Sequence, residues 1–276
     1  MRPEDFPYNK ERIGANGEAI KGPSVIALGS GDFVVAAVGN VNPAGVRPLH
    51  VFGDHGRELS LITSYLQKKV TIGRADSNNV VSPIRSVSFR HAEITREQNE
   101  WRVSDIGSLN GTFMEEIEVI PADGEVVHIP RGEVRFIPSL DSEDVDVDIQ
   151  LGSVNGKLVE HEGDKFLTVN GKNYPLILNM PHHVGRSKIQ SSEKDIDRGK
   201  KRNNIIIVDE SIDDSHVILI PLSEGVIILD QDSREGTRVK VTPHDTVESR
   251  DVFTVDKHEI ATMDEESARW WKELGK

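Results

Sequence analysis

Four polar side chains between residues 73 and 112 combine groups that can hold an anion. Arg74 follows a glycine, Ser88 and His91 stand three residues apart, and Asn110 precedes another glycine. A planar guanidinium can bind two phosphate oxygens at once, and a hydroxyl adds one more donor. The sequence offers His91 no nucleophile partner, so general-base catalysis is not indicated. These four residues therefore favour an anion-binding function over catalysis.

Short strand-like segments must position these side chains. Val70 and Ile72 flank a threonine, and residues 92–94 and 101–103 also alternate apolar with polar side chains. Such alternation is typical of half-buried β-strands. The polar residues therefore fall in the loops that join strands, which is where binding residues usually lie.

Three blocks of this stretch match a known pattern. They are Gly73-Arg74, Ser88-Phe89-Arg90-His91, and the run from Asp105 to Thr112, which reads Asp-Ile-Gly-Ser-Leu-Asn-Gly-Thr. The order Gly-Arg, Ser-x-x-His, Asp-x-x-Ser-x-Asn-Gly-Thr resembles the forkhead-associated (FHA) domain, a β-sandwich that reads phosphothreonine. Three blocks in order on a strand-rich background are a specific signal.

The resemblance implies a role for each motif residue. Arg74 and Ser88 are expected to bind the phosphate, and Asn110 is expected to hold the peptide backbone on either side of the phosphothreonine. The remaining motif residues are expected to be structural: Gly73, His91, Gly111 and Thr112. Glycine at such positions allows tight or positive-φ backbone.

Two positions depart from the family pattern. Phe89 stands where the family often has arginine, and Leu109 stands where it often has threonine or arginine. Arg85 and Arg90 are close in sequence and either supply the missing positive charge or are ordinary surface residues. Phe89 and Leu109 can instead form an apolar wall that selects the side chains following the phosphothreonine.

A second set of motifs follows the first. His216 and Thr237 each lie 125 residues after His91 and Thr112, and Gly185-Arg186 lies 112 residues after Gly73-Arg74. The segment from Ser88 to Thr112 aligns without a gap on residues 213–237. The chain therefore contains an internal repeat.

The second copy lacks the binding residues. Arg186 is kept, but Asp213 replaces the serine, Asp214 follows it, and Glu235 replaces the asparagine. At an effective dielectric constant of ~20, two like charges ~4 Å apart repel by roughly 4 kcal/mol. That exceeds the ~1.5–3 kcal/mol of a charge-assisted hydrogen bond. The second copy is expected not to bind phosphopeptides, and Arg186 is expected to pair with one of the acids.

The sequence therefore predicts an all-β protein with two antiparallel FHA-like β-sandwiches in tandem and a short C-terminal helix. The expected divisions are an N-terminal extension with a hairpin (1–46), a first FHA domain (47–138), a degenerate second domain (139–262) with a charged insertion (187–204), and the helix (263–276). Two Asn-Gly pairs, Asn155-Gly156 and Asn170-Gly171, indicate hairpin turns in the second domain.

Composition limits the function further. The chain has 276 residues and a formal net charge of −13, which disfavours nucleic acid and anionic lipid as partners. It has no cysteine, its first residues are not a secretory signal, and its apolar runs are too short to cross a bilayer. We expect a cytoplasmic protein without membrane insertion.

No cofactor, metal site or enzyme activity is expected. Phosphate-binding loops, Gly-x-Ser-x-Gly and His-Glu-x-x-His motifs are all absent. Asp144, Asp146 and Asp148 are spaced like the start of a calcium loop, but Ile149 replaces the required glycine and Asn155 the required glutamate. The alternation of residues 145–149 indicates a strand instead.

Two binding hypotheses follow. In the first, the protein is a phosphothreonine-dependent adaptor that binds a Ser/Thr-phosphorylated protein, either a kinase or a kinase substrate. In the second, it is a phosphorylation-independent scaffold in a larger cytosolic or secretion-associated assembly. Binding that survives phosphatase treatment would separate the second from the first.

Overall fold

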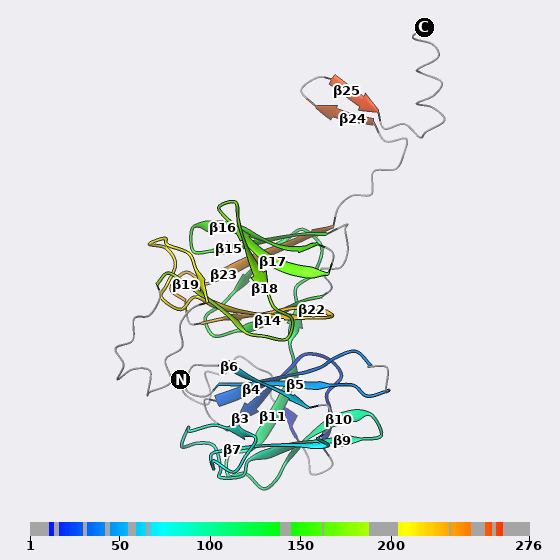
Figure 1. Ribbon diagram of the computed structural model, residues 1–276, viewed down its shortest axis with the longest axis vertical. Helices are drawn as coiled ribbons and strands as arrows, with labels where there is room; N and C mark the ends of the chain where they lie inside the picture. Colours follow the sequence, from blue (N-terminus) through cyan, green and yellow to red (C-terminus); the bar gives the residue numbers. More distant parts are fainter. Residues whose placement is uncertain are drawn as a thin grey trace.

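The regular elements of the protein are all β-strands in the residues that its computed structural model describes (Figure 1). These residues are 11–13, 17–29, 32–41, 45–54, 59–64, 67–138, 145–161, 163–187, 204–231, 233–243, 252–255 and 258–261. The fold is all-β, as the alternating pattern predicts. The helix expected at 263–276 lies outside the described residues.

The first sandwich consists of two sheets. Its six-stranded sheet has the order β1 (Glu11–Arg12), β11 (Thr112–Glu116), β3 (Ser24–Leu28), β4 (Asp32–Val38), β5 (Leu49–Asp54), β6 (Leu59–Ser64). Its five-stranded sheet has the order β2 (Glu18–Ala19), β10 (Glu100–Asp105), β9 (Ala92–Glu97), β7 (Lys69–Gly73), β8 (Val80–Val81).

The second sandwich has two six-stranded sheets. One has the order β12 (Glu118–Val119), β14 (Val134–Pro138), β22 (Gly225–Asp230), β21 (Val217–Leu222), β19 (His182–Gly185), β20 (Ile205–Ile206). The other has the order β13 (Val126–Ile129), β23 (Thr237–Pro243), β15 (Val145–Leu151), β16 (Val154–His161), β17 (Asp164–Val169), β18 (Lys172–Leu176). Strands β24 (Val252–Val255) and β25 (His258–Ala261) pair with each other.

The two sandwiches correspond strand for strand. Strands β1 to β11 occupy the same places in the first as β13 to β23 in the second, and among the described strands of the two sandwiches only β12 has no counterpart. For example, β1 pairs with β11 as β13 pairs with β23, and β2 pairs with β10 as β14 pairs with β22. The repeated motifs therefore lie at equivalent places in two similar sandwiches.

Strand pairing divides the chain differently from the division expected above. The hairpin expected within residues 1–46 is present as β3 and β4, but it lies inside the six-stranded sheet of the first sandwich. Residues 118–138, expected to close the first domain, form strands bonded to β22 and β23 of the second sandwich. We assign residues 118–138 to the second sandwich because the described hydrogen bonds of their strands lie within its sheets.

Apolar layers lie inside each sandwich and also between them. Side chains such as Ile72, Ile94 and Trp101 fill the first sandwich, and a second core that includes Leu219 fills the other. A third buried cluster joins β3, β4 and β5 of the first sandwich to β14, β21 and β22 of the second. Strands β21 and β22 are therefore buried on both faces, and the four sheets stack as successive layers (Figure 1).

The turn predictions have mixed outcomes. Asn170-Gly171 forms the turn between β17 and β18, with positive φ at both residues (+51° and +72°). The prediction for Asn155-Gly156 is wrong, because both residues lie inside β16 and the turn before it is made by Gly152 and Ser153. The strand predicted over 145–149 is confirmed as β15, with Val147 and Ile149 buried.

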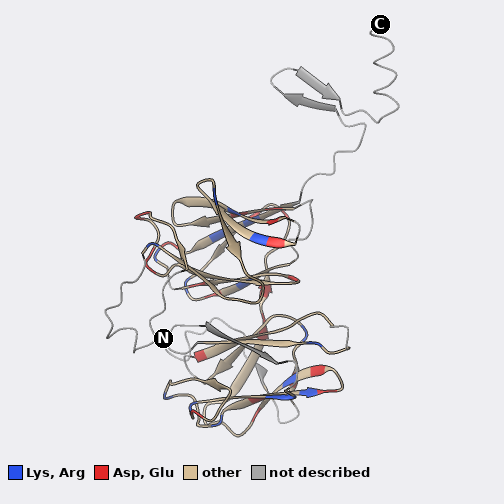
Figure 2. Ribbon diagram, viewed as in Figure 1, with Lys and Arg blue, Asp and Glu red and all other residues tan. Residues whose placement is uncertain are grey.

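Charge is distributed over the whole body. Figure 2 shows Lys and Arg interspersed with Asp and Glu on both sandwiches rather than gathered on one of them. Within the described residues, no helix long and apolar enough to cross a bilayer is found.

Candidate functional site

The loops that follow β7, precede β9 and precede β11 meet at one end of the first sandwich. The backbone N–H of Arg74 donates to the carbonyl of Ser88 (2.9 Å), and that of Ala75 donates to the carbonyl of Phe89 (3.1 Å). Gly73 makes this contact possible, since a Cβ there would lie 2.5 Å from the carbonyl oxygen of Phe89. The sequence motifs Gly-Arg and Ser-x-x-His are thus brought together.

Arg74 presents its guanidinium at this end. Its Nε donates to the carbonyl of Val87 (3.2 Å), and its Cζ lies 4.3 Å from the centre of the Phe89 ring. In the described part of the chain, no carboxylate forms an ion pair with Arg74, Arg85 or Arg90. An anion approaching Arg74 therefore meets an arginine whose terminal nitrogens have no acidic partner there.

Ser88 and Asn110 are held at the same end by hydrogen bonds between the loops. The hydroxyl oxygen of Ser88 accepts a hydrogen bond from the N–H of Leu109 (3.0 Å), which leaves its proton able to donate. The side-chain amide of Asn110 donates to the carbonyl of Ser86 (2.7 Å), and Asn110 itself is exposed. These contacts hold both side chains at the surface.

His91 braces the loops from beneath. It is fully buried, its Nδ1 accepts from the N–H of Ser88 (3.1 Å), and its Nε2 lies 3.0 Å from the carbonyl oxygen of Gly111. This pattern assigns the neutral tautomer with the proton on Nε2. Burial lowers the pKa of His91, against smaller opposing effects of its bond to Gly111 and of nearby Asp105. Its contacts are those of a structural residue.

Asp105 organises the Asn-Gly-Thr turn. One carboxylate oxygen accepts from the N–H groups of Gly107 and Ser108 (2.8 and 2.9 Å), and the other from the hydroxyls of Ser108 and Thr112 (2.5 and 2.8 Å). Burial acts to raise the pKa of Asp105, but these hydrogen bonds outweigh it and lower that pKa. Thr112 is buried and held by Asp105, and Gly111 takes a positive φ of +83°.

Two positioning residues were missed by the sequence reasoning. The buried side chain of Asn78 donates to the carbonyls of Ala75 and Phe89 (2.8 and 2.7 Å) and so ties two site loops together. An asparagine at position 203, again 125 residues later, was the available signal. Gly29, in the turn after β3, has φ +66°, and a Cβ there would lie 2.9 Å from the Ser86 carbonyl oxygen. It lies far from every motif, and its signals were the expected hairpin turn and the tripeptide Leu-Gly-Ser, which recurs at residues 151–153.

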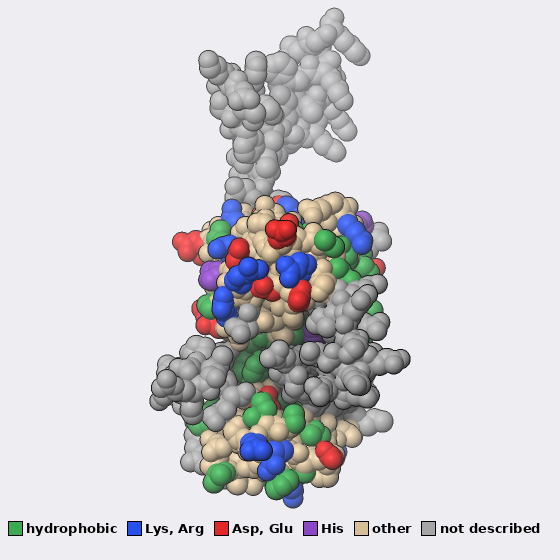
Figure 3. Space-filling view, turned by 90° about the vertical axis from the view of Figure 1, so that its left-hand side faces the viewer, with side chains coloured by type: hydrophobic (Ala, Val, Ile, Leu, Met, Phe, Trp, Pro, Cys, Tyr) green, Lys and Arg blue, Asp and Glu red, His purple; other side chains and the backbone are tan. Residues whose placement is uncertain are grey.

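Phe89 and Leu109 are the exposed apolar residues of this end, with 64% and 88% of their surface accessible. Figure 3 views the side of the molecule that lies to the left in Figure 1. On the first sandwich, basic side chains are surrounded there by hydrophobic ones, and on the second they alternate with acidic ones. At the first site itself, the exposed Phe89 ring is the apolar neighbour of the Arg74 guanidinium.

The equivalent end of the second sandwich keeps the hydrogen bonds that support the loops but has different residues at the site positions. The N–H of Arg186 donates to the Asp213 carbonyl (2.9 Å), and Asp230 accepts from the hydroxyls of Ser233 and Thr237 (2.7 and 3.0 Å), as in the first sandwich. The side chain of Arg186, however, bonds to Asp214 (3.2 Å). The prediction that Arg186 pairs with an acid agrees with this contact.

Asp213 fills the place of the serine hydroxyl. Its carboxylate accepts from the N–H of Arg234 (2.5 Å), the position equivalent to Leu109, and also pairs with the Arg234 guanidinium (3.4 Å). A carboxylate of the protein therefore occupies the hydrogen-bonding position that Ser88 has in the first sandwich.

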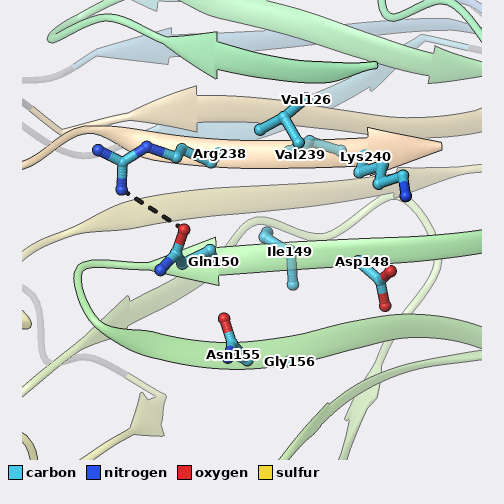
Figure 4. A pocket seen from close by; sticks show the side chains of 9 residues that line it. All are labelled: Val126, Asp148, Ile149, Gln150, Asn155, Gly156, Arg238, Val239 and Lys240. Atoms are coloured by element: carbon cyan, nitrogen blue, oxygen red, sulfur yellow. Dashed lines mark hydrogen bonds between the residues drawn. The ribbon is translucent and has the colours of Figure 1, made fainter. Parts of the chain in front are cut away.

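A cavity of about 350 Å³ lies elsewhere, on the sheet of β13, β23, β15 and β16 (Figure 4). Arg238 at its edge is hydrogen-bonded to Gln150 (3.4 Å), and Asp148 pairs with Lys157 (3.6 Å). Arg238 and Asp148 thus already have polar partners. We do not assign a function to this cavity.

Comparison with known protein families gives one match. The FHA domain model matches residues 70–133, so the chain contains an FHA domain. The match begins in β7 and extends past β13, and it includes Arg74, Ser88 and Asn110.

Similar proteins are found in Mycobacterium tuberculosis and Mycolicibacterium smegmatis. FHA domain-containing protein FhaB of Mycobacterium tuberculosis is 38% identical over 66 residues, which is 24% of this chain and 40% of that protein. The glycogen accumulation regulator GarA of Mycolicibacterium smegmatis is 33% identical over 81 residues, 28% of this chain and 51% of that protein. The chain thus spans between two fifths and about half of these relatives. No solved structure matches.

Proposed function

We propose that the protein is a phosphothreonine-dependent adaptor that acts through the first site. The observation that carries this proposal is Arg74, whose terminal guanidinium nitrogens have no carboxylate partner among the described residues and lie beside the Ser88 hydroxyl loop. In this proposal Arg74 and Ser88 bind the phosphate and Asn110 binds the peptide backbone. Arg85 and Arg90 add positive charge, and Phe89 and Leu109 contact the residues after the phosphothreonine.

The partner class follows from this chemistry. A phosphothreonine carries close to two negative charges and three acceptor oxygens, which suits an arginine and a hydroxyl. The partner is then a Ser/Thr-phosphorylated protein, a kinase or a kinase substrate. The proposal assigns no catalysis. It places the protein in the cytoplasm, because a chain without cysteine suits a reducing compartment.

The second sandwich has a different role in this proposal. Its place for a phosphate is taken by Asp213 and Asp214, which hold Arg234 and Arg186. We propose that it is a degenerate FHA copy that serves as a structural or phosphorylation-independent docking partner of the first. This is also the observation in favour of a phosphorylation-independent scaffold as the second candidate function.

A peptide library tests the proposal. Phosphothreonine peptides with randomised flanks are screened against the wild-type chain, and hits are remeasured by calorimetry as phosphothreonine, phosphoserine and unphosphorylated forms. We expect binding of the phosphothreonine form and its loss in Arg74→Ala and in Ser88→Ala, with circular dichroism unchanged. Equal binding of the unphosphorylated form would overturn the adaptor proposal and favour the scaffold.

A further inference from the structure

Two sets of strands in this chain suit the same places in a sandwich. Strands β1 and β2 complete the first sandwich by pairing with β11 and β10, and β13 and β14 complete the second by pairing with β23 and β22. Each completing pair therefore precedes the sandwich that it completes. Yet the FHA match runs continuously from β7 past β13, into a strand that is bonded to the other sandwich.

A third segment of the same kind follows the second sandwich. Val126, Ile129, Glu133 and Val134 are repeated 126 residues later as Val252, Val255, Glu259 and Ile260. The later residues form β24 and β25, which pair with each other. Three completing segments thus accompany two sandwiches, one before, one between and one after.

The hairpins next to these segments are equivalent as well. In the first sandwich Gly29, with φ +66°, lies against the Ser86 carbonyl, and in the second Gly152, with φ +58°, lies against the carbonyl of Ser211. Ser211 lies 125 residues after Ser86 and is its counterpart. Residues 145–161 therefore have the turn geometry that the first sandwich requires from residues 24–38.

We propose that the two sandwiches exchange their completing strands. In the exchanged arrangement residues 126–161 follow the FHA motifs directly and complete the first sandwich. Residues 11–38, which hold the equivalent places in the first sandwich, then take the places that residues 126–161 leave in the second, and residues 252–261 compete with them for the places of β13 and β14. This inference goes beyond the proposed function, and its test uses no phosphopeptide.

The residues on the outer faces of the β3–β4 and β15–β16 hairpins determine whether the two sandwiches stay in contact after the exchange. In the observed arrangement Val25 and Val35 lie in the buried cluster between the sandwiches. The registers place Asp148 of β15 where Val25 of β3 now lies, since Glu115 opposes Val25 and its counterpart Lys240 opposes Asp148. A carboxylate at that place disfavours an apolar interface. Strand exchange therefore separates the two sandwiches, and the observed arrangement is the closed form.

Cysteine pairs report each arrangement, because the chain has none of its own. Ser24 opposes Glu116 in the observed pairing, and the equivalent register would bring Val147 opposite Glu116 after exchange. Opposite residues have Cβ atoms roughly 5 Å apart, within reach of a disulfide. In the closed form β11 and β15 are separated by the sheet of β21 and β22, so about 20 Å lie between them.

The test compares Ser24→Cys/Glu116→Cys with Val147→Cys/Glu116→Cys in the full chain under mild oxidation. We expect the first pair to cross-link quickly and the second slowly, both within one chain. Adding Ile220→Asp, whose side chain lies in the buried interface, should raise the yield of the second pair several-fold. Leu219→Asp on the opposite face of the same strand is the matched control, because it damages the core in either arrangement.

Two results would overturn the proposal. One is no cross-link of the Val147/Glu116 pair, in the wild-type background or with Ile220→Asp, under conditions where the Ser24/Glu116 pair reacts fully. The other is a cross-link found only in dimers, which means exchange between copies rather than within one chain. Since the wild-type background alone decides the matter, loss of folding in Ile220→Asp does not protect the proposal.

Discussion

The ends of the two sandwiches that carry the motif loops share the same supporting hydrogen bonds and differ in the side chains at the binding position. Both keep the buried histidine and the Asp-Ser-Thr network, with the Asp-to-Thr hydroxyl bond at 2.8 Å in one and 3.0 Å in the other. In the first, the Leu109 N–H meets a serine hydroxyl, and in the second the equivalent N–H meets a carboxylate. Loop geometry can thus persist while the charge that decides anion binding is reversed.

The difference in phosphopeptide binding between the two ends is tested most directly at Arg74 and Arg186. Arg74→Ala should weaken binding of a phosphothreonine peptide by up to ~100-fold, because a charge-assisted pair worth up to ~3 kcal/mol is lost. Arg186→Ala is the matched control and should leave the affinity unchanged, since Arg186 is paired with Asp214. Fluorescence anisotropy with one labelled peptide measures both. Equal losses in the two variants would show that the ends are not functionally different.

A glycine outside every motif should also matter. Gly29→Val should weaken phosphopeptide binding at least ~10-fold and destabilise the fold by ~1–3 kcal/mol, because its φ is +66° and its side chain would strike Ser86 and Asn110. Gly22→Val is the control, with nothing within 4 Å of its Cβ. Urea titrations and anisotropy separate stability from affinity. Unaltered affinity in Gly29→Val would remove this turn from the site.

Restoring the residues of the first site in the second sandwich tests whether its three acids are what prevents phosphothreonine binding. Asp213→Ser, Asp214→Ala and Glu235→Asn together remove the three carboxylates and return the serine and asparagine of the first site. We expect weak phosphothreonine binding to appear, measured in an Arg74→Ala background so that only the second site reports. If no binding appears while the fold is intact, the acids are not what blocks that end.

Acid should destabilise both sandwiches alike. Burial is the main effect on the pKa of His91 and of His216, and it lowers both below the ordinary value of 6.5. The unfolded chain then binds more protons than the folded one below about pH 6.5, so stability falls as pH drops through that range. Thermal unfolding at pH 8, 6.5 and 5.5 measures it. A constant midpoint over this series would contradict the buried neutral histidines.

The smallest effect is expected at Phe89. Phe89→Ala removes a stacking contact with Arg74 worth ~0.5–1 kcal/mol at an exposed site, so affinity should change by less than about tenfold. The preference for residues after the phosphothreonine should change more than the affinity does. A peptide array with randomised flanks measures this, with Val119→Ala, an exposed apolar residue outside the site, as the control. An identical preference profile would exclude Phe89 from specificity.

That the motif residues come together at one end of a sandwich could largely be predicted, because the information is local. Gly73, Arg74, Ser88, His91, Asn110 and Thr112 lie in short motifs whose spacing already implies loops between strands. Asn78 and Gly29 were missed because they act through contacts. Asn78 bonds to carbonyls 3 and 11 residues away, and Gly29 packs on loops that are remote in sequence.

By itself, the sequence determined the strands, the repeat and the residues that make one end cationic and the other acidic. Alternation and side-chain chemistry are properties of short segments, and they survive without knowledge of neighbours. Only the tertiary structure decided which strands complete each sandwich. Residues 11–20 and 126–138 meet the same pairing requirements, and alternation specifies a face but not a partner. That choice depends on the apolar interface between the sandwiches, which no single segment encodes.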